Sequence, residues 1–358
     1  MGTKSVRYFL GANSAQGFYS LYDGFVQPEA GDFLWVIKGG PGCGKSTFMK
    51  KIGSAAENAG LSVEYILCSG DPESLDGIYI RELSTAYVDG TSPHIMDCSL
   101  PGGGGLYLDL GAFYHPDPLL KRRNELVQLF SAYKRQYARA YELLRAASCL
   151  SPECVPGLVE PEVRVQVEKR AESLARRIIP TGDGYREKRR FLSGISCAGF
   201  CRLSDSVESQ CPQVITLDDE LGLADVFLQE IRSACIRREQ PVILCPCPLN
   251  PQRLEAVLLP ETELAFVAVS RRKPWQGSVW RHLRLDAMAD PQAIRSLREE
   301  YKAAQRIQDE LIDLACHSLH KAKAFHDDLE AVYHPYVDFE GQNELCQLHI
   351  DYLLGRME

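Results

Sequence analysis

The sequence predicts an α/β fold with two tandem copies of a parallel-sheet core, each followed by a helical appendage. Three observations predict it. Near the N-terminus, a glycine-rich loop stands between an apolar run and a helix-forming segment, an order that is typical of parallel α/β units. The first core recurs later in the chain at a nearly constant shift in numbering. Segments with apolar residues at helical spacing and mixed charge follow each copy.

The composition is that of a globular protein with room for two cores. A length of 358 residues predicts roughly two domains, and 45% hydrophobic with 25% charged residues is an ordinary composition. A net charge of −8 argues against a protein that coats nucleic acid. The chain has no apolar run of transmembrane length, and its N-terminus lacks signal-peptide and myristoylation patterns. We therefore expect a cytoplasmic location and no membrane partner.

The first element pair is a strand and a helix joined by a loop. The apolar run from Phe33 to Ile37 predicts a buried strand, and a helix is predicted from Ser46 to Ala59. The segment between and into the helix fits the pattern G-x4-G-K-[ST] and comprises Gly39, Gly40, Pro41, Gly42, Cys43, Gly44, Lys45, Ser46 and Thr47. Strand, loop and helix in this order predict a P-loop NTPase-like core.

This loop has a specific chemistry. Its glycines let successive backbone N–H groups point at phosphates, and the helix N-terminus adds further donors. Lys45 is predicted to reach the β- and γ-phosphates, and the Ser46 hydroxyl is predicted to bind Mg²⁺. The predicted ligands are Mg²⁺ and a nucleoside triphosphate. We take the nucleotide to be ATP, although the sequence does not distinguish ATP from GTP.

The repeat provides an internal comparison for this loop. Residues 9–23 match residues 191–205 at a shift of 182, and the shift becomes 179 from Phe48 and Phe227 onward. At that shift, the second copy has Ala224 where the first has Lys45, and Asp225 where it has Ser46. Carboxylates crowd this second loop, namely Asp218, Asp219, Glu220 and Asp225. Because like charges repel, we expect no nucleotide in the second half.

A second acid is needed to hold Mg²⁺, and two aspartates compete for this role. Asp89 and Asp109 each end an apolar run that predicts a strand. Asp89 corresponds to Ala268 in the second copy, so it is absent where Lys45 is absent. This correlation favours Asp89 over Asp109.

Further polar residues are weaker candidates. Asp71 and Asp76 follow the second predicted strand, where ligands of α/β sheets bind, although an architectural role for Asp76 is equally consistent. His94 is a candidate base or γ-phosphate sensor. Arg271 and Arg272 follow a strand of the second copy and would face the first site if the halves packed with pseudo-symmetry.

The remaining segments are predicted to be helical. Long helices are expected from Leu119 to Cys149 and from Pro291 to Leu319, with second helices at about Glu162 to Ile179 and about Lys321 to Tyr333. The resulting units are an intact P-loop core at 1–112, an appendage at 113–185, a degenerate core at 186–289 and an appendage at 290–358.

The chain resembles a family of uncharacterised bacterial P-loop ATPases with two tandem halves, found largely in spore-forming bacteria. The stretches that carry the resemblance are FLGANSAQGFYSLYD, GGPGCGKSTFMKKIG, VEYILCSGDPESLDGIYI and AYVDGTSPH. Members often carry a glycine-rich, lysine-containing loop in the second half too, and the segment Asp218 to Val226 departs from this. The resemblance implies ATP binding and supplies no substrate.

These observations predict a Mg²⁺-dependent ATPase with one site, in the N-terminal half, and a second half that does not bind nucleotide. Two alternatives remain open. One is a small-molecule kinase that transfers the phosphoryl group to an acceptor held by Asp71, Asp76 or His94. The other is a nucleotide-gated interaction protein in which the helices from Leu119 to Ile179 bind a protein partner.

Overall fold

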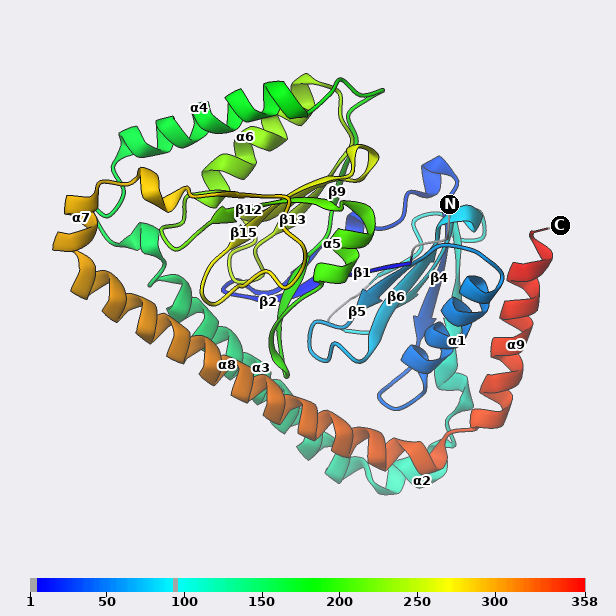
Figure 1. Ribbon diagram of the computed structural model, residues 1–358. Helices are drawn as coiled ribbons and strands as arrows, with labels where there is room; N and C mark the ends of the chain where they lie inside the picture. Colours follow the sequence, from blue (N-terminus) through cyan, green and yellow to red (C-terminus); the bar gives the residue numbers. More distant parts are fainter. Residues whose placement is uncertain (1–4, 93–95, 358) are drawn as a thin grey trace.

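The computed structural model describes residues 5–92 and 96–357, and it contains two α/β cores (Figure 1). The first sheet has the order β1-β5-β6-β7-β4-β8, and the second, read from its equivalent edge, has the order β9-β13-β14-β15-β12-β16. The strands of the first sheet are β1 (Val6–Phe9), β4 (Phe33–Lys38), β5 (Val63–Leu67), β6 (Leu75–Ile80), β7 (Thr85–Asp89) and β8 (Gly105–Asp109). Those of the second are β9 (Glu187–Arg189), β12 (Gln213–Asp218), β13 (Val242–Pro246), β14 (Leu254–Leu259), β15 (Leu264–Val269) and β16 (Arg281–Leu283).

The two sheets have the same topology, which agrees with a tandem arrangement of two related halves. Both sheets are mixed, whereas the sequence predicted parallel cores. β6 runs antiparallel to β5 and β7, and β14 runs antiparallel to β13 and β15. The segments that join these strands, 68–74 and 81–84 in the first half, are too short for the crossover that a parallel pair requires.

Strand register refines the alignment of the two loops. Phe33 pairs with Thr85, and Gln213 pairs with Leu264, so Phe33 is equivalent to Gln213 and Lys38 to Asp218. The helices that follow the loops, α1 (Lys45–Asn58) and α6 (Ala224–Arg237), begin at equivalent residues. Six residues separate strand from helix in the first half and five in the second. The second loop is therefore one residue shorter, and Asp218 ends a strand instead of occupying the position of Gly39.

Long helices lie beneath both cores in Figure 1. The remaining helices are α2 (Pro116–Lys121), α3 (Arg123–Ser148), α4 (Pro161–Ile178), α5 (Ser204–Gln210), α7 (Pro291–Ser296), α8 (Arg298–Tyr333) and α9 (Phe339–Gly355). The predicted helix boundary near residue 320 was wrong, because α8 runs through it and ends just before Pro335, which interrupts helical hydrogen bonding. In the described part of the chain, every helix is too short or too polar to span a bilayer.

Each appendage covers the core of the opposite half. α4 packs on α6, where Val167 and Leu174 share a core cluster with Phe227. α9 packs on α1, where Cys346 and Leu353 share a cluster with α1 residues. α3 and α8 run antiparallel along each other and connect the two cores (Figure 1). The sequence predicted each appendage as a unit beside the core that precedes it in the chain. In the structure, α4 and α9 each pack on the core of the other half.

The halves meet across an approximate twofold axis. Phe9 and Phe191, which are equivalent in the repeat, exchange two backbone hydrogen bonds of 3.0 and 2.9 Å. Asn13 donates its side-chain amide to the carbonyl of its own equivalent, Ile195, at 2.9 Å. The hairpins β2 (Gly11–Ser14) with β3 (Gly17–Ser20), and β10 (Ser193–Ser196) with β11 (Gly199–Arg202), flank these contacts. One apolar cluster draws side chains from both sheets, so the halves share a core.

Candidate functional site

The glycine-rich loop folds as a tight turn between β4 and α1. Gly42 and Gly44 have φ angles of 68° and 79°, in the left-handed region that glycine favours. A Cβ on Gly39 would lie 2.5 Å from the Cys43 sulfur, so this position also requires glycine. The loop sequence and its backbone therefore agree, and the loop leads directly into the N-terminus of α1.

Lys45 places its ammonium group inside this loop. Its Nζ donates to the carbonyl oxygens of Gly39 and Gly40, each at 2.9 Å, and lies 3.6 Å from Asp89 Oδ2. The side chains of Lys45 and Asp89 are only 12% and 14% exposed. The structure thus brings together two of the predicted site residues, a cation at the start of α1 and an acid at the end of β7.

The two competing aspartates flank β4 on opposite sides. Asp89 accepts hydrogen bonds from the Thr91 N–H at 2.9 Å and hydroxyl at 2.6 Å, and burial raises the pKa of its carboxyl against the opposing charge of Lys45. Asp109 is exposed and accepts from the Gly111 N–H at 2.8 Å. Asp89 therefore has the contact with Lys45 that the metal-holding role favours, while Asp109 caps a turn. The choice between them stays a prediction.

Ser46 has a structural partner in addition to its predicted metal role. Its hydroxyl accepts the Leu75 N–H at 3.0 Å. In the second half, Asp225 accepts the equivalent Leu254 N–H at 2.8 Å. An acceptor at this position therefore fixes the start of β6 in the first half and of β14 in the second. A hydroxyl oxygen has a second lone pair, so the bond to Leu75 leaves Ser46 able to bind a cation.

The end of α8 and the start of α9 lie against the outside of the loop. A Cβ on Gly42 would lie 3.1 Å from Glu330 Cα, and one on Gly44 would lie 3.0 Å from Gln342 Oε1. On another side, the Tyr114 hydroxyl donates to the Pro41 carbonyl at 2.8 Å. These neighbours come from segments remote in sequence, so no local pattern indicated them.

A histidine does lie in this region, but it is His326 of α8. His94 is outside the described residues. Burial lowers the pKa of the His326 imidazole, and the positive charges of Lys323 and Lys45 lower it further against the raising effect of Glu330. Its Nδ1 is 3.7 Å from Glu330 Oε1. A neutral imidazole beside a carboxylate is a group that can accept a proton from water.

The other weaker candidates have mainly structural partners. Asp71 Oδ2 lies 3.5 Å from Lys323 Nζ, which ties the loop after β5 to α8. Asp76 is buried and accepts from the Tyr22 hydroxyl at 3.2 Å. The negative charge of Asp76 also contributes to the raised pKa of the Asp89 carboxyl, so Asp76 lies close to the pair formed by Lys45 and Asp89.

The expectation that Arg271 and Arg272 face the first site was wrong. Arg271 pairs with Asp309, and Arg272 pairs with Asp309 at 3.2 Å and with Asp313 at 2.6 Å. Both aspartates are on α8. The arginines follow β15, which pairs with β12, the strand that precedes the second loop. They therefore lie beside the loop of the second half and not beside that of the first.

The second loop carries carboxylates where a phosphate would bind its backbone. Asp219 Oδ1 accepts the N–H of Ala224, the first residue of α6, at 3.0 Å. Asp286 accepts the N–H groups of Glu220 and Leu221 at 3.0 and 3.2 Å. The sequence predicted charge repulsion at this loop. The contacts show in addition that the N–H groups of Glu220, Leu221 and Ala224 are already bound by acids of the same chain.

Asp286 should make folding stability depend on pH. Burial raises the pKa of its carboxyl to about 6 from the ordinary 3.8. The folded state then holds the extra proton between these two values, so this residue's contribution to stability falls as pH rises through that window. We expect Asp286→Asn to reduce the loss of stability between about pH 4 and about pH 6, measured by urea unfolding. The control is Asp183→Asn, at a side chain that is 74% exposed; an Asp286→Asn protein with the unaltered pH dependence would contradict the assignment.

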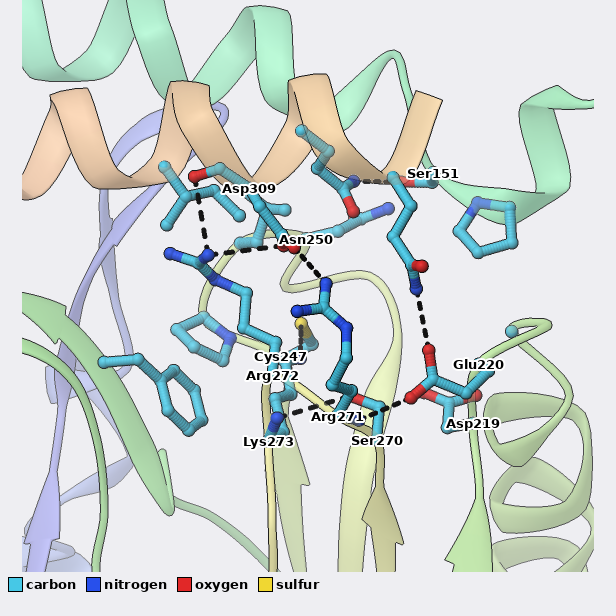
Figure 2. Close-up of a pocket in the computed structure, with 18 of the residues that line it drawn as sticks. Ser151, Asp219, Glu220, Cys247, Asn250, Ser270, Arg271, Arg272, Lys273 and Asp309 are labelled. Atoms are coloured by element: carbon cyan, nitrogen blue, oxygen red, sulfur yellow. Dashed lines mark hydrogen bonds and ion pairs between the residues drawn. The ribbon is translucent and has the colours of Figure 1, made fainter. Parts of the chain in front are cut away.

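A cavity of about 120 Å³ lies beside this second loop (Figure 2). Its walls are formed by the loops that follow β12, β13 and β15, by α8, by the hairpin of β10 and β11, and by the segment that follows α3. Its polar lining includes Ser151, Asp219, Glu220, Cys247, Asn250, Arg253, Ser270, Arg271, Arg272, Lys273, Gln305, Gln308 and Asp309.

Comparisons of the chain with models of known protein families, with curated protein sequences and with solved structures found no match. The functional interpretation therefore rests on the loop motif and on the geometry around it.

Proposed function

We propose that the chain binds ATP with Mg²⁺ at the loop Gly39–Thr47 and hydrolyses the nucleotide at this one site. The observation that supports the proposal best is the pair formed by Lys45 and Asp89. A glycine-rich loop alone is a common turn, but here its lysine lies 3.6 Å from an acid at the end of the adjacent strand. A cation suited to phosphate oxygens and an acid suited to Mg²⁺ thus lie next to each other, which supports the proposal.

The residues present fit both ligands. Loop amides, the N-terminus of α1 and the Lys45 ammonium suit phosphate oxygens. The Ser46 hydroxyl and the Asp89 carboxylate are oxygen donors, the type that Mg²⁺ prefers, and the bound ion would neutralise charge on the phosphates. Lys45 would exchange its bonds with the Gly39 and Gly40 carbonyls for bonds with phosphate oxygens.

Groups from the second half complete the surroundings of this site. His326 and Glu330 come from α8, and the main chain of Glu330 contacts the loop at Gly42. Because burial favours the neutral imidazole, His326 is able to accept a proton from an attacking water. The second half thus supports the reaction without a nucleotide site of its own, since its loop donors are bound by Asp219 and Asp286.

A second candidate function is a nucleotide-gated interaction protein. The contacts of Glu330 and Gln342 with the loop favour it, because a ligand that changes the loop must change its packing against α8 and α9. In this case ATP would bind tightly with almost no turnover, and the position of the helices would be the output.

A turnover assay separates these functions. Purified protein is incubated with Mg-ATP or Mg-GTP, with and without cell extract, and release of phosphate is measured alongside binding by calorimetry. We expect phosphate release without extract. Turnover that requires extract would instead indicate transfer to an acceptor, and tight binding with no turnover in either condition would indicate gating. The absence of binding to both nucleotides would refute the proposal.

A further inference from the structure

We propose that Cys247 and Lys273 of the second half become joined by a covalent bridge through one oxygen atom, with dioxygen as the oxidant. Cys247 follows β13 and Lys273 lies in the loop after β15, and both line the cavity shown in Figure 2. Lys273 Nζ donates to Cys247 Sγ at 3.0 Å. The bridge is a modification site of the second half, and it does not depend on ATP binding in the first.

The main chain holds the two reactive atoms together. The Cys247 N–H donates to the Arg253 carbonyl at 2.8 Å, and the Lys273 N–H donates to the Ser270 carbonyl at 3.0 Å. Arg202 donates to the Lys273 carbonyl at 3.0 Å. An oxygen atom bonded to both sulfur and nitrogen needs these atoms only slightly closer than they already are. Because groups held in contact react as if they were at very high concentration, this geometry favours the bridge.

A buried acid beside the lysine is placed to take up its proton. Burial lowers the pKa of the Lys273 ammonium, but the neighbouring Cys247 and Glu255 outweigh this effect and raise the pKa above its ordinary value. The nitrogen therefore forms a new bond only after its proton has moved. Glu255 is 2% exposed, and its Oε2 lies 3.7 Å from Lys273 Nζ and 3.9 Å from Arg202. This oxygen has no hydrogen-bond partner among the described residues, so it is free to accept the proton.

The cavity gives a small oxidant access to the thiol. Its volume is about 120 Å³, and Cys247 is partly exposed. The reaction breaks the S–H bond, one N–H bond of the neutral amine and the bond of dioxygen. It forms an S–O and an O–N bond, and the second oxygen atom leaves as water with the two released hydrogens. Sulfur and nitrogen each lose two electrons, and dioxygen gains the four. Two equivalents of a dithiol reverse the oxidation and restore the thiol, the amine and one water.

The first half contains two matched comparisons. Cys68 is equivalent to Cys247, but the residue at the position of the lysine is His94, which has no amine to supply. In the glycine-rich loop, Lys45 Nζ lies 3.8 Å from Cys43 Sγ, but Cys43 is 1% exposed and out of reach of a dissolved oxidant. We therefore expect the bridge at Cys247 and at neither of these cysteines of the first half.

Mass spectrometry of the unaltered protein is the decisive test. The protein is purified in dithiothreitol, transferred to air-saturated buffer and digested with trypsin without reductant. We expect a cross-linked pair of the peptides 239–253 and 273–281, whose mass exceeds their sum by one oxygen less two hydrogens. Fragmentation should place the link on Cys247 and Lys273. Dithiothreitol added before digestion should remove the pair, and a sample kept under argon should not contain it.

The matched variants are Lys273→Arg, Cys247→Ser and Cys68→Ser. Lys273→Arg keeps the positive charge beside Glu255 but replaces the amine by a guanidinium that stays protonated, so it should not form the pair. Cys247→Ser should lack it too, whereas Cys68→Ser should form it as the unaltered protein does. The proposal is overturned if Cys247 of the unaltered protein stays a thiol in air. It is equally overturned if oxidation of Cys247 gives a sulfenic acid, a sulfinic acid or a disulfide with no link to Lys273.

Discussion

Replacing Lys45 by alanine should remove ATP binding that calorimetry can measure. The ammonium group is the one cation inside the glycine-rich loop among the described residues, and it is 12% exposed. Charge-assisted hydrogen bonds contribute about 1.5–3 kcal/mol each. Loss of two such bonds to phosphate oxygens corresponds to a loss of affinity of about 100-fold or more.

Two controls make this result specific. Lys50→Ala removes a lysine from the same helix whose Nζ bonds the Glu73 carbonyl at 2.6 Å, and its ATP affinity should be unchanged. Ala224→Lys places a lysine at the equivalent position of the second half. It should create no second site, because that loop is one residue shorter and its donors are bound by Asp219 and Asp286. Undiminished affinity in Lys45→Ala would refute the site.

The sequence predicted those parts of the molecule that local patterns determine. The strand and helix around the glycine-rich loop agree with β4 and α1, because a continuous apolar run and the positions of glycines act over a few residues. The repeat predicted two related halves, and both sheets have the same strand order. Asp89 was favoured by comparing the copies, and the structure places it beside Lys45.

The parts that were missed depend on contacts between distant segments. Apolar spacing identified α4 as a helix with a buried face but contained no information on which core would cover that face. In the same way, His326 is an ordinary residue of a mixed-charge helix in the sequence, and only the packing of α8 brings it near the loop. The direction of β6 could have been predicted, since a seven-residue connection excludes a crossover helix.

The exchange of appendages makes each half part of the other half's core. α9, which ends the second half, covers α1 of the first, and the buried Arg190–Glu64 pair joins the halves with a 2.5 Å contact. Removal of one partner of such a buried pair leaves an uncompensated charge, so the halves depend on each other for stability. The second half can therefore be retained for stability even though its loop lacks the lysine and most of the glycines of the first loop.

Replacing Asp89 by asparagine should reduce Mg²⁺-dependent turnover by about 100-fold or more while ATP affinity changes little. Lys45 and the loop amides, which supply most contacts to phosphate, remain in this variant. The amide oxygen of asparagine can still accept the hydrogen bonds from Thr91, so the end of β7 should keep its shape. What is lost is the negative charge that would hold the cation against the phosphates.

The decisive comparison is Asp109→Asn, which makes the same chemical change at the end of β8, on the other side of β4. Asp109 is exposed and bonds the Gly111 N–H, with no contact to Lys45 among the described residues, so its loss should affect turnover only weakly. Phosphate release is measured for both variants over a range of Mg²⁺ concentrations. If Asp109→Asn abolishes turnover and Asp89→Asn does not, the exposed acid is the metal ligand, and the contact between Asp89 and Lys45 serves only to hold the loop in place.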